Sequence, residues 1–385
     1  LTLSGQTNGR YYQAYSISFL DPWFGGKRPN TLSISAYFSK QTDISTSYLS
    51  NAYNSYNPYY YGGYPGYGGY YGGYGGYYGY GYDPYGSYEL ALNPDKSIMM
   101  FGLAAGYGKR LNWPDDFFQF MATLNYQVYK MHDWDYFLVN NGTCHNVNLE
   151  LLLQRNSIDN PLYTRSGSQF SFSVAATPPF SLFDNKDYAS MSDQDPDKFK
   201  MIEYHKWKFK AKVFSPLAPV SVKRTPVLMT RAEFGFLGTY NKHKRSPFET
   251  FYMGGDGMTG YSSTYATETI GLRGYENGSI AGNGGYSSYG LAYTRLSMEL
   301  RYPFILEPSS TIYGLVFAEA GNAWTDMSNY NPFDLKRSAG VGVRIFLPMI
   351  GLMGIDWAYG FDEANYGSGG KRSGSNFHFI IGQEF

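Results

Sequence analysis

The feature that most constrains this chain is a strict alternation of charged and apolar side chains. It is clearest between positions 206 and 213, where Lys206, Lys208, Lys210 and Lys212 alternate with Trp207, Phe209, Ala211 and Val213. Successive side chains of a β-strand point to opposite faces, whereas a helix would scatter both sets around its circumference. We therefore predict a strand with one charged face and one apolar face.

Alternation of this kind recurs along the whole chain. Fourteen segments show it: 1–7, 10–20, 31–39, 98–110, 117–129, 146–155, 169–176, 205–214, 226–240, 291–302, 311–323, 339–347, 352–360 and 376–385. With strands of about ten residues, these segments account for much of the sequence and leave no linker. We predict an all-β fold and a single barrel domain over residues 1–385.

The connections favour a membrane barrel over a soluble β-sandwich, a choice that alternation alone leaves open. Turns on one side are short, as at 113–116 and 306–309, whereas 42–96, 183–202 and 241–292 are long and polar. This asymmetry is typical of transmembrane antiparallel β-barrels of the outer-membrane type. The sequence has no apolar run of about 18 residues, which excludes a membrane-spanning helix. We expect the protein in the cell outer membrane, in contact with its lipid.

Charge and cysteine content exclude several other classes of protein. The chain has 31 Lys+Arg and 31 Asp+Glu, so no long-range attraction to nucleic acid is expected. Its one cysteine, Cys144, excludes a disulfide framework and any metal site built from several cysteines. The five histidines lack metal-ligand spacing, and no nucleophile with a neighbouring base is recognisable. We predict no metal, no cofactor and no catalytic residue, and hence not an enzyme.

One connection has an extreme composition. From 59 to 82 every residue except Pro65 is Tyr or Gly, with 12 Tyr and 11 Gly in 24 positions. Glycine raises the entropy that ordering would cost, so a separately folded element is not expected. We predict an external loop at about 42–97. Tyrosines give amphipathic contact area, so the loop could bind glycans or proteins, and a mobile loop without a ligand is the other interpretation.

A short motif in the long connection at about 241–290 points to a family. Its residues are Leu272, Arg273, Gly274 and Tyr275. The chain resembles the transport barrel of BamA and its relatives in the bacterial surface antigen superfamily, whose sixth external loop carries a Val/Leu-Arg-Gly-Phe/Tyr motif. The stretches 297–300, 316–324 and 340–348 are similar to the strands that follow that loop in the family. The resemblance covers the whole chain.

The resemblance implies a role for the arginine of this motif. In the family the loop folds back into the lumen, so Arg273 is expected to be held there by Glu299 and Glu319 on the inner wall. A guanidinium can satisfy two carboxylates through charge-assisted bonds, and an unpaired charge in a confined lumen is costly. We refer to this expected arrangement as the loop lock.

The C-terminal segment resembles the β-signal of outer-membrane proteins. Four side chains share one face of the predicted strand and Gly382 lies among them: Phe377, Phe379, Ile381 and Phe385. In the family the lateral seam of the barrel forms between the first and last strands. The unpaired edge of this terminal strand is therefore expected to template an incoming strand.

The family barrel has sixteen strands and follows a series of soluble POTRA domains. The fourteen segments predicted here correspond to its third to sixteenth strands. We expect the remaining strands and domains to lie upstream of Leu1.

The resemblance implies an assembly subunit that folds and inserts nascent outer-membrane proteins through a lateral seam. Accessory assembly lipoproteins similar to BamD are the expected partners, and the process needs no covalent chemistry. A two-partner-secretion or TamA-like translocation barrel of the same superfamily is the first alternative. A surface adhesion or structural barrel that acts through the Tyr/Gly loop is the second.

Overall fold

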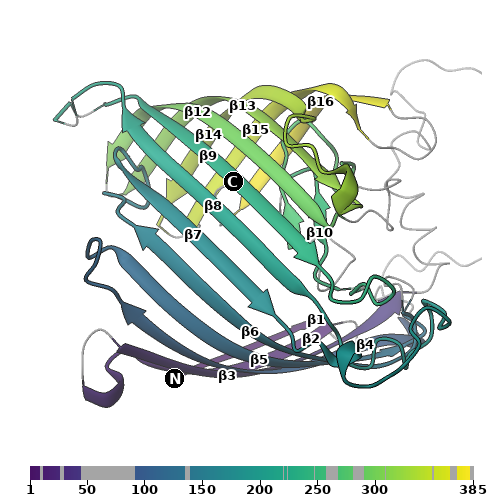
Figure 1. Ribbon diagram of the computed structural model, residues 1–385. Coiled ribbons are helices and arrows are strands. Elements are labelled where there is room, and N and C mark those ends of the chain that lie inside the picture. The colour runs from purple at the N-terminus through teal and green to yellow at the C-terminus, as the bar shows by residue number, and fades with distance from the viewer. Residues whose placement is uncertain are drawn as a thin grey trace, which may run out of the picture.

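The structure, a computed structural model, describes residues 1–8, 12–26, 30–44, 92–134, 139–219, 221–222, 224–246, 248–256, 268–280, 290–307, 309–348, 351–364 and 371–381. Fourteen of its strands form one antiparallel sheet that curls into the wall of a barrel (Figure 1). The predicted fold class is confirmed, and the fourteen predicted segments match the fourteen strands of the wall one by one.

The wall follows chain order, so each strand pairs with the next one in the sequence except at β9, which pairs with β12. Its strands are β1 (Thr2–Asn8), β2 (Tyr12–Asp21), β3 (Asn30–Ile44), β4 (Leu92–Arg110), β5 (Phe118–His132), β6 (Gly142–Asn156), β7 (Gly167–Ala176), β8 (His205–Pro216), β9 (Val227–Gly238), β12 (Ala292–Glu307), β13 (Ser310–Trp324), β14 (Lys336–Leu347), β15 (Gly351–Ala364) and β16 (Lys371–Ile381). The connections include three short 3-10 helices: η1 (Phe24–Gly26), η2 (Phe180–Leu182) and η5 (Met327–Asn329).

The two faces of the wall differ as the alternation predicts. On β8, Trp207 and Phe209 are exposed on the outer face, while Lys206 is buried in the interior. On β9 the inward positions include Arg231 and Glu233, which are both buried. Apolar side chains that would be costly to expose to water face outward along most strands, which suits a lipid environment. Among the described residues, no helix has the length and apolar character needed to cross a membrane.

The loop predicted at about 42–97 is shorter than expected at both ends. β3 continues to Ile44 and β4 begins at Leu92, because the two strands resume pairing after a register shift between Thr42 and Asp43. The pairs Asp43–Asn93 and Ile44–Leu92 extend the sheet beyond the point where alternation ends. The rest of this connection, with the Tyr/Gly tract at 59–82, lies outside the described residues.

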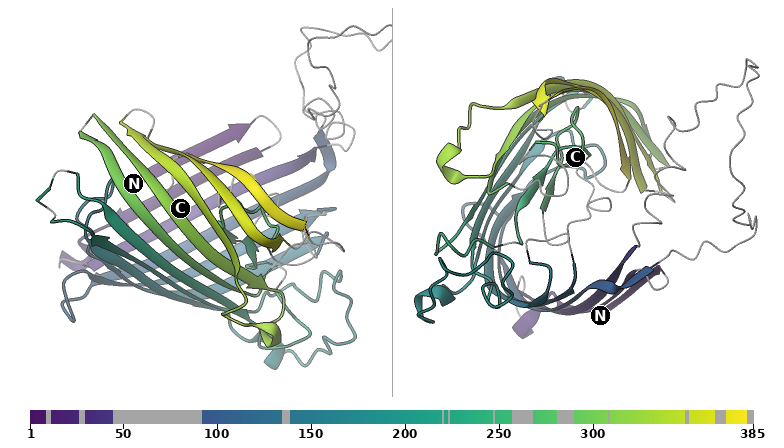
Figure 2. Two further views of the ribbon diagram at one scale, coloured as in Figure 1. Left: turned by 90° about the horizontal axis from the view of Figure 1, so that it is seen from above. Right: turned by 90° about the vertical axis from the view of Figure 1, so that its right-hand side faces the viewer.

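The long connection at about 241–290 contains two short strands that were not predicted. β10 (Phe251–Met253) and β11 (Glu268–Ile270) pair in parallel, and Figure 2 (right) shows this green segment within the curve of the wall. Strands of three residues are too short to show a period. Their apolar side chains belong to the buried core cluster inside the barrel, so the described part of the loop packs as a plug against the wall.

The wall has two edge strands in the described part of the chain. β1 begins the sheet order and β16 ends it, with β2 and β15 as their respective neighbours. In Figure 2 (right) the purple and yellow ends of the sheet face each other across an opening. β16 therefore offers a backbone edge beside the strands that bind the lumen loop.

Candidate functional site

Arg273 lies at the centre of a buried cluster of charges. Its guanidinium contacts three carboxylates from three wall strands: Glu299 on β12 at 2.6 Å, Glu319 on β13 at 2.8 Å and Asp356 on β15 at 2.9 Å. All four side chains are at most 1% exposed. The Arg273 backbone N–H also donates to Glu319 Oε2 at 2.9 Å. One loop residue thus connects three strands of the wall.

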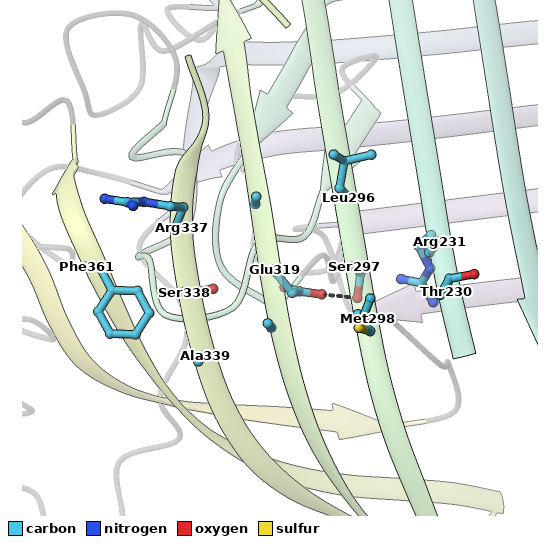
Figure 3. Close-up of a pocket in the computed structure, with 12 residues that line it drawn as sticks. Thr230, Arg231, Leu296, Ser297, Met298, Glu319, Arg337, Ser338, Ala339 and Phe361 are labelled. Atoms are coloured by element: carbon cyan, nitrogen blue, oxygen red, sulfur yellow. Dashed lines mark hydrogen bonds between the residues drawn. The ribbon is translucent and has the colours of Figure 1, made fainter. Parts of the chain in front are cut away.

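Each of these carboxylates also binds an arginine of the wall itself. Arg301 donates to Glu299 at 2.7 Å, Arg295 to Glu319 at 2.8 Å and Arg344 to Asp356 at 2.6 Å. Figure 3 shows Glu319 of β13 pointing toward Ser297 of β12, whose hydroxyl donates to it at 3.1 Å. Cross-strand neighbours on one face of a sheet lie close enough to form such pairs. Each of the three carboxylates therefore has a cationic partner on the wall in addition to Arg273 of the loop.

Alternation explains why the sequence brings these groups together. The sheet register pairs Ser297 with Glu319, and Arg295, Ser297, Glu299 and Arg301 occupy every second position of β12. Outward residues between them are apolar, so every charged group of this segment faces the lumen. Apolar side chains of β13 also face inward, and one of them, Phe317, lies under the Arg273 guanidinium at 3.5 Å from its ring centroid. A cation over an aromatic face is stabilised electrostatically.

The charge state of Arg273 follows from its partners. Burial alone would lower the pKa of the guanidinium, but Glu319, Glu299 and Asp356 raise it above its usual value. Arg273 is therefore a permanently charged loop residue that three carboxylates of the wall hold in place.

Gly274 joins the motif to β16. Its N–H donates to His378 Nε2 at 2.8 Å, and its carbonyl accepts from Asn376 Nδ2 at 3.0 Å. Its φ is +90°, a conformation that favours glycine, and an added Cβ would lie 2.9 Å from the backbone nitrogen of Gly360. The motif thus requires glycine here for both backbone conformation and close approach to the wall.

The other two motif residues fix the ends of the same turn. Leu272 is fully buried and its N–H donates to the carbonyl of Gly255 at 3.1 Å. The Tyr275 hydroxyl donates to the carbonyl of Arg337 on β14 at 2.7 Å, and burial raises the pKa of Tyr275 to about 12. The four motif residues together contact β12, β13, β14, β15 and β16.

The structure brings together part of the predicted site. Leu272, Arg273, Gly274 and Tyr275 meet Glu299 and Glu319 in one cluster. The terminal-strand residues lie elsewhere: Phe377 and Phe379 are exposed on the outer face of β16, 66% and 56% respectively. The backbone of Ile381 forms the last position of β16, but its side chain is not described. Gly382 and Phe385 lie outside the described residues.

Three residues that contact the motif were not predicted from the sequence: Asp356, Asn376 and His378. Asp356 carries a usable signal, because it lies between Ile355 and Trp357, which are 53% and 40% exposed. A single carboxylate between two outward apolar residues has to face the lumen. The hydrogen bonds of Asn376 and His378 go to backbone atoms of Gly274, and such pairings leave no pattern in the sequence.

The outer surface behind the cluster is apolar. A groove of about 750 Å³ crosses β9, β12, β13, β14 and β15, and Leu296, Met298, Ala339 and Phe361 line it (Figure 3). In the part of the chain that the structure describes, no group of three or more His, Cys, Asp or Glu side chains could hold a metal ion. The cluster is thus an arrangement for holding a loop, with polar contacts inside the wall and apolar surface outside.

Solved structures with this fold include a crystal structure of BamA from Haemophilus ducreyi lacking POTRA domains 1-3. It matches with a TM-score of 0.59 and 16% identity over 98% of this chain and 63% of that chain. CdiB from Escherichia coli matches with a TM-score of 0.50 and 9% identity, over 96% and 52%. CdiB from Acinetobacter baumannii gives a TM-score of 0.47 and 10% identity, over 96% and 49%.

These likenesses concern the fold, and the chain spans less than two thirds of the length of each of these proteins. A comparison with curated proteins gave no match. The family comparison covers the chain from end to end, because the Omp85 superfamily domain matches residues 1–385. With its antiparallel barrel wall and lumen loop, the chain belongs to the Omp85 superfamily.

Proposed function

We propose that this barrel is the membrane part of an outer-membrane protein assembly factor, which folds and inserts nascent β-barrel proteins. The observation that supports the proposal is the set of wall strands that the loop motif contacts. Arg273 binds β12, β13 and β15, and Gly274 binds β16, the edge strand of the described wall. The loop therefore controls the strands beside the edge at which a new strand would pair.

The proposed mechanism uses backbone chemistry alone. An unpaired strand edge presents a row of N–H and C=O groups that can pair with another chain. In the described residues β16 pairs with β15 on one side, and its outer face carries exposed Phe377 and Phe379 for contact with lipid. An incoming strand would add to the free side, while the Gly274 contacts hold β16 in register. No covalent step or cofactor is involved.

The partners follow from this mechanism and remain part of the proposal. They are nascent outer-membrane β-barrel proteins, the outer-membrane lipid around the apolar belt, and accessory assembly lipoproteins of the BamD type. A nucleic acid is not among them, since the chain has no net charge. The site of action would be the cell outer membrane.

A translocation barrel of the same superfamily is the second candidate. CdiB from Escherichia coli shares the fold at a TM-score of 0.50, and this likeness supports the second candidate. Translocation needs a path through the lumen, where Arg273 and Tyr275 of the loop are now fully buried against the wall. Assembly at the edge needs no such path, and we favour it for that reason. The adhesion hypothesis concerns the Tyr/Gly tract, and deletion of 59–82 tests it through lost surface binding.

Site-specific crosslinking tests the assembly proposal. A photo-crosslinking amino acid replaces Phe379 on β16 in the complete protein, reconstituted in lipid vesicles with an unfolded eight-stranded barrel as substrate. The matched control is the same replacement at Val341 on β14, since the two side chains are 56% and 49% exposed on the outer face. We expect adducts with the substrate at position 379 and few at 341. Equal labelling at both positions, or no acceleration of substrate folding, would contradict the proposal.

A further inference from the structure

A second contact holds the lumen loop against another strand on the same inner face of the wall, away from the Arg273 cluster. Glu268 of β11 binds three lysines of β8: Lys206 at 3.1 Å, Lys208 at 3.1 Å and Lys210 at 3.3 Å. We call these lysines the lysine strip. They occupy every second position of one strand, so their side chains project from the same inner face of the wall. One carboxylate thus bridges the whole strip.

Neighbouring contacts support the same placement of the loop. Glu249, also in the loop, lies 3.5 Å from Lys206, whose ammonium group is 4.7 Å from the ring centroid of Phe251 on β10. The Glu268 N–H donates to the carbonyl of Thr250 at 2.9 Å, which ties β11 to the start of β10. Both loop segments therefore meet the lysine strip as one unit.

The electrostatics of Glu268 agree with this geometry. Burial would raise the pKa of its carboxyl, but Lys206, Lys208 and Lys210 lower it to about 2 from an ordinary value of 4.5. The side chain is 22% exposed, and those of Lys208 and Lys210 are 26% and 40% exposed. Partly hydrated pairs of this kind are sensitive to salt, unlike the fully buried Arg273 cluster.

We propose that the lysine strip of β8 is an interaction surface for the chain's own β11, and that Glu268 acts as a second anchor of the lumen loop. In sheet order β9 separates β8 from β12, so the two anchors lie on either side of β9. The side chains of the Arg273 anchor are fully buried, so we expect this anchor to stay bound. The Glu268 anchor is hydrated and adjustable, so it sets how firmly β10 and β11 stay on the wall while Arg273 remains bound.

The biological purpose of the second anchor rests on the proposed function. The anchor itself does not, because docking of the loop can be measured without a substrate. Hydrogen exchange of the amides in 248–256 and 268–280 reports the anchor directly, in the complete protein in lipid nanodiscs. Glu268→Gln keeps the shape and removes the charge, and we expect exchange in β10 and β11 to accelerate about two- to fivefold. The matched control, Glu276→Gln, removes the same charge from an exposed side chain of the same loop and should change nothing.

A double-mutant cycle then identifies the partner of Glu268. Lys206→Gln, Lys208→Gln and Lys210→Gln are combined, with and without Glu268→Gln. We expect the glutamate substitution to have no further effect once the lysines are neutral, because coupled residues are not additive. An equal effect in both backgrounds, or no effect of Glu268→Gln in the native background, overturns the proposal.

Salt provides a second test that needs no variant of the strip. Raising the salt concentration from about 0.1 to 1 M shortens the screening length from about 10 to 3 Å. The unmodified protein should then exchange faster in β10 and β11, and exchange in 272–275 should change little. Salt-independent exchange in both segments would overturn the anchor. Absent substrate folding with normal salt sensitivity would instead overturn the assembly function and leave the anchor intact.

Discussion

At the scale of single residues, the wall side of the Arg273 cluster balances its own charge. Glu299, Glu319 and Asp356 each keep an arginine of the wall when Arg273 is absent: Arg301, Arg295 and Arg344 respectively. Loss of Arg273 therefore leaves no uncompensated buried carboxylate. The free energy it contributes belongs to docking of the loop, and the strands of the wall do not depend on it.

This balance predicts a selective effect of Arg273→Ala. Because Glu299, Glu319 and Asp356 keep their wall arginines, we expect a cost of about 2 kcal/mol, the lower end of the range for truncating a buried charge pair, and it should fall on loop docking. Exchange protection of amides 272–280 should drop accordingly, while the urea midpoint of the barrel changes little. The control is Arg337→Ala, whose side chain is 68% exposed in its pair with Asp362, so little effect on stability is expected. A barrel that loses as much stability as the loop would contradict the separation.

Gly274→Ala tests the close approach of the motif to β15. The residue has φ +90°, and Gly351 has φ +89° but no atom within 4 Å of an added Cβ. Both substitutions carry the left-handed strain of about 1–2 kcal/mol. Only at position 274 would the methyl group also meet the backbone of Gly360, so we expect a further loss of about 1–3 kcal/mol in loop docking. Equal losses for both variants in the exchange measurement would show that contact with the wall is unimportant.

At the scale of strands, the alternation of apolar and polar residues predicted the fourteen strands of the wall, and it did not predict the two short strands of the lumen loop. Fourteen wall strands have one face in lipid and one in the lumen, and this two-sided environment imposes alternation on the sequence. β10 and β11 have three residues each and depend on contacts with distant parts of the chain, so no local signal marks them. The extensions of β3 and β4 follow a register shift, which likewise breaks the period.

Alternation could predict those residues of the site whose charged side chains occupy inward positions of a wall strand. Glu299 follows from alternation with the polar residues around it on β12. Glu319 shares its face with inward Leu315 and Phe317, which belong to a buried apolar cluster, and the Phe317 ring also stacks with the Arg273 guanidinium. The resemblance supplied Glu319 where parity did not. The contribution of Asp356 depends on the three-dimensional approach of β15 to the loop, which the spacing of residues along the chain does not encode.

The β11 element should respond to acid through Glu268. Its carboxyl has a depressed pKa of about 2 against an ordinary 4.5, so it stabilises the docked state above pH 4.5. That stabilisation is lost as the pH falls from about 4.5 toward 2, because protonation becomes favourable first in the undocked state. A spin label at Thr269→Cys on β11, with Cys144→Ala, should gain mobility in this range. Glu268→Gln should be mobile at neutral pH already, and a transition retained in that variant would exclude Glu268 as its cause.

At the scale of the whole molecule, the wall and the loop form a barrel whose lumen is occupied and charged. The fold matches BamA from Haemophilus ducreyi at a TM-score of 0.59, although the identity is 16%. Conservation of the fold at this identity is understandable, because alternation and strand pairing constrain the kind of residue at each position more than its identity.

Away from the strand ends, the described residues of β6 to β15 place more cationic than anionic side chains on the inner face. Eight cations occupy such positions, Lys206, Lys208, Lys210, Lys212, Arg231, Arg295, Arg301 and Arg344, against five carboxylates, Glu150, Glu233, Glu299, Glu319 and Asp356. A passage lined mainly by one sign of charge concentrates ions of the opposite sign. Any current through this lumen should therefore be carried mainly by anions.

Release of the loop should reveal this selectivity. In planar lipid bilayers, the native protein should conduct weakly because the loop fills the lumen, and Arg273→Ala should conduct more often and with higher amplitude. In a potassium chloride gradient, its reversal potential should shift toward that of chloride. Neutralising Lys206, Lys208 and Lys210 to Gln in the same background should move the reversal potential back toward zero or beyond, since the five carboxylates then match the remaining five cations. Cation preference in Arg273→Ala would mean that the permeating ions avoid the lysine-bearing side of the wall, and that the loop leaves a path elsewhere.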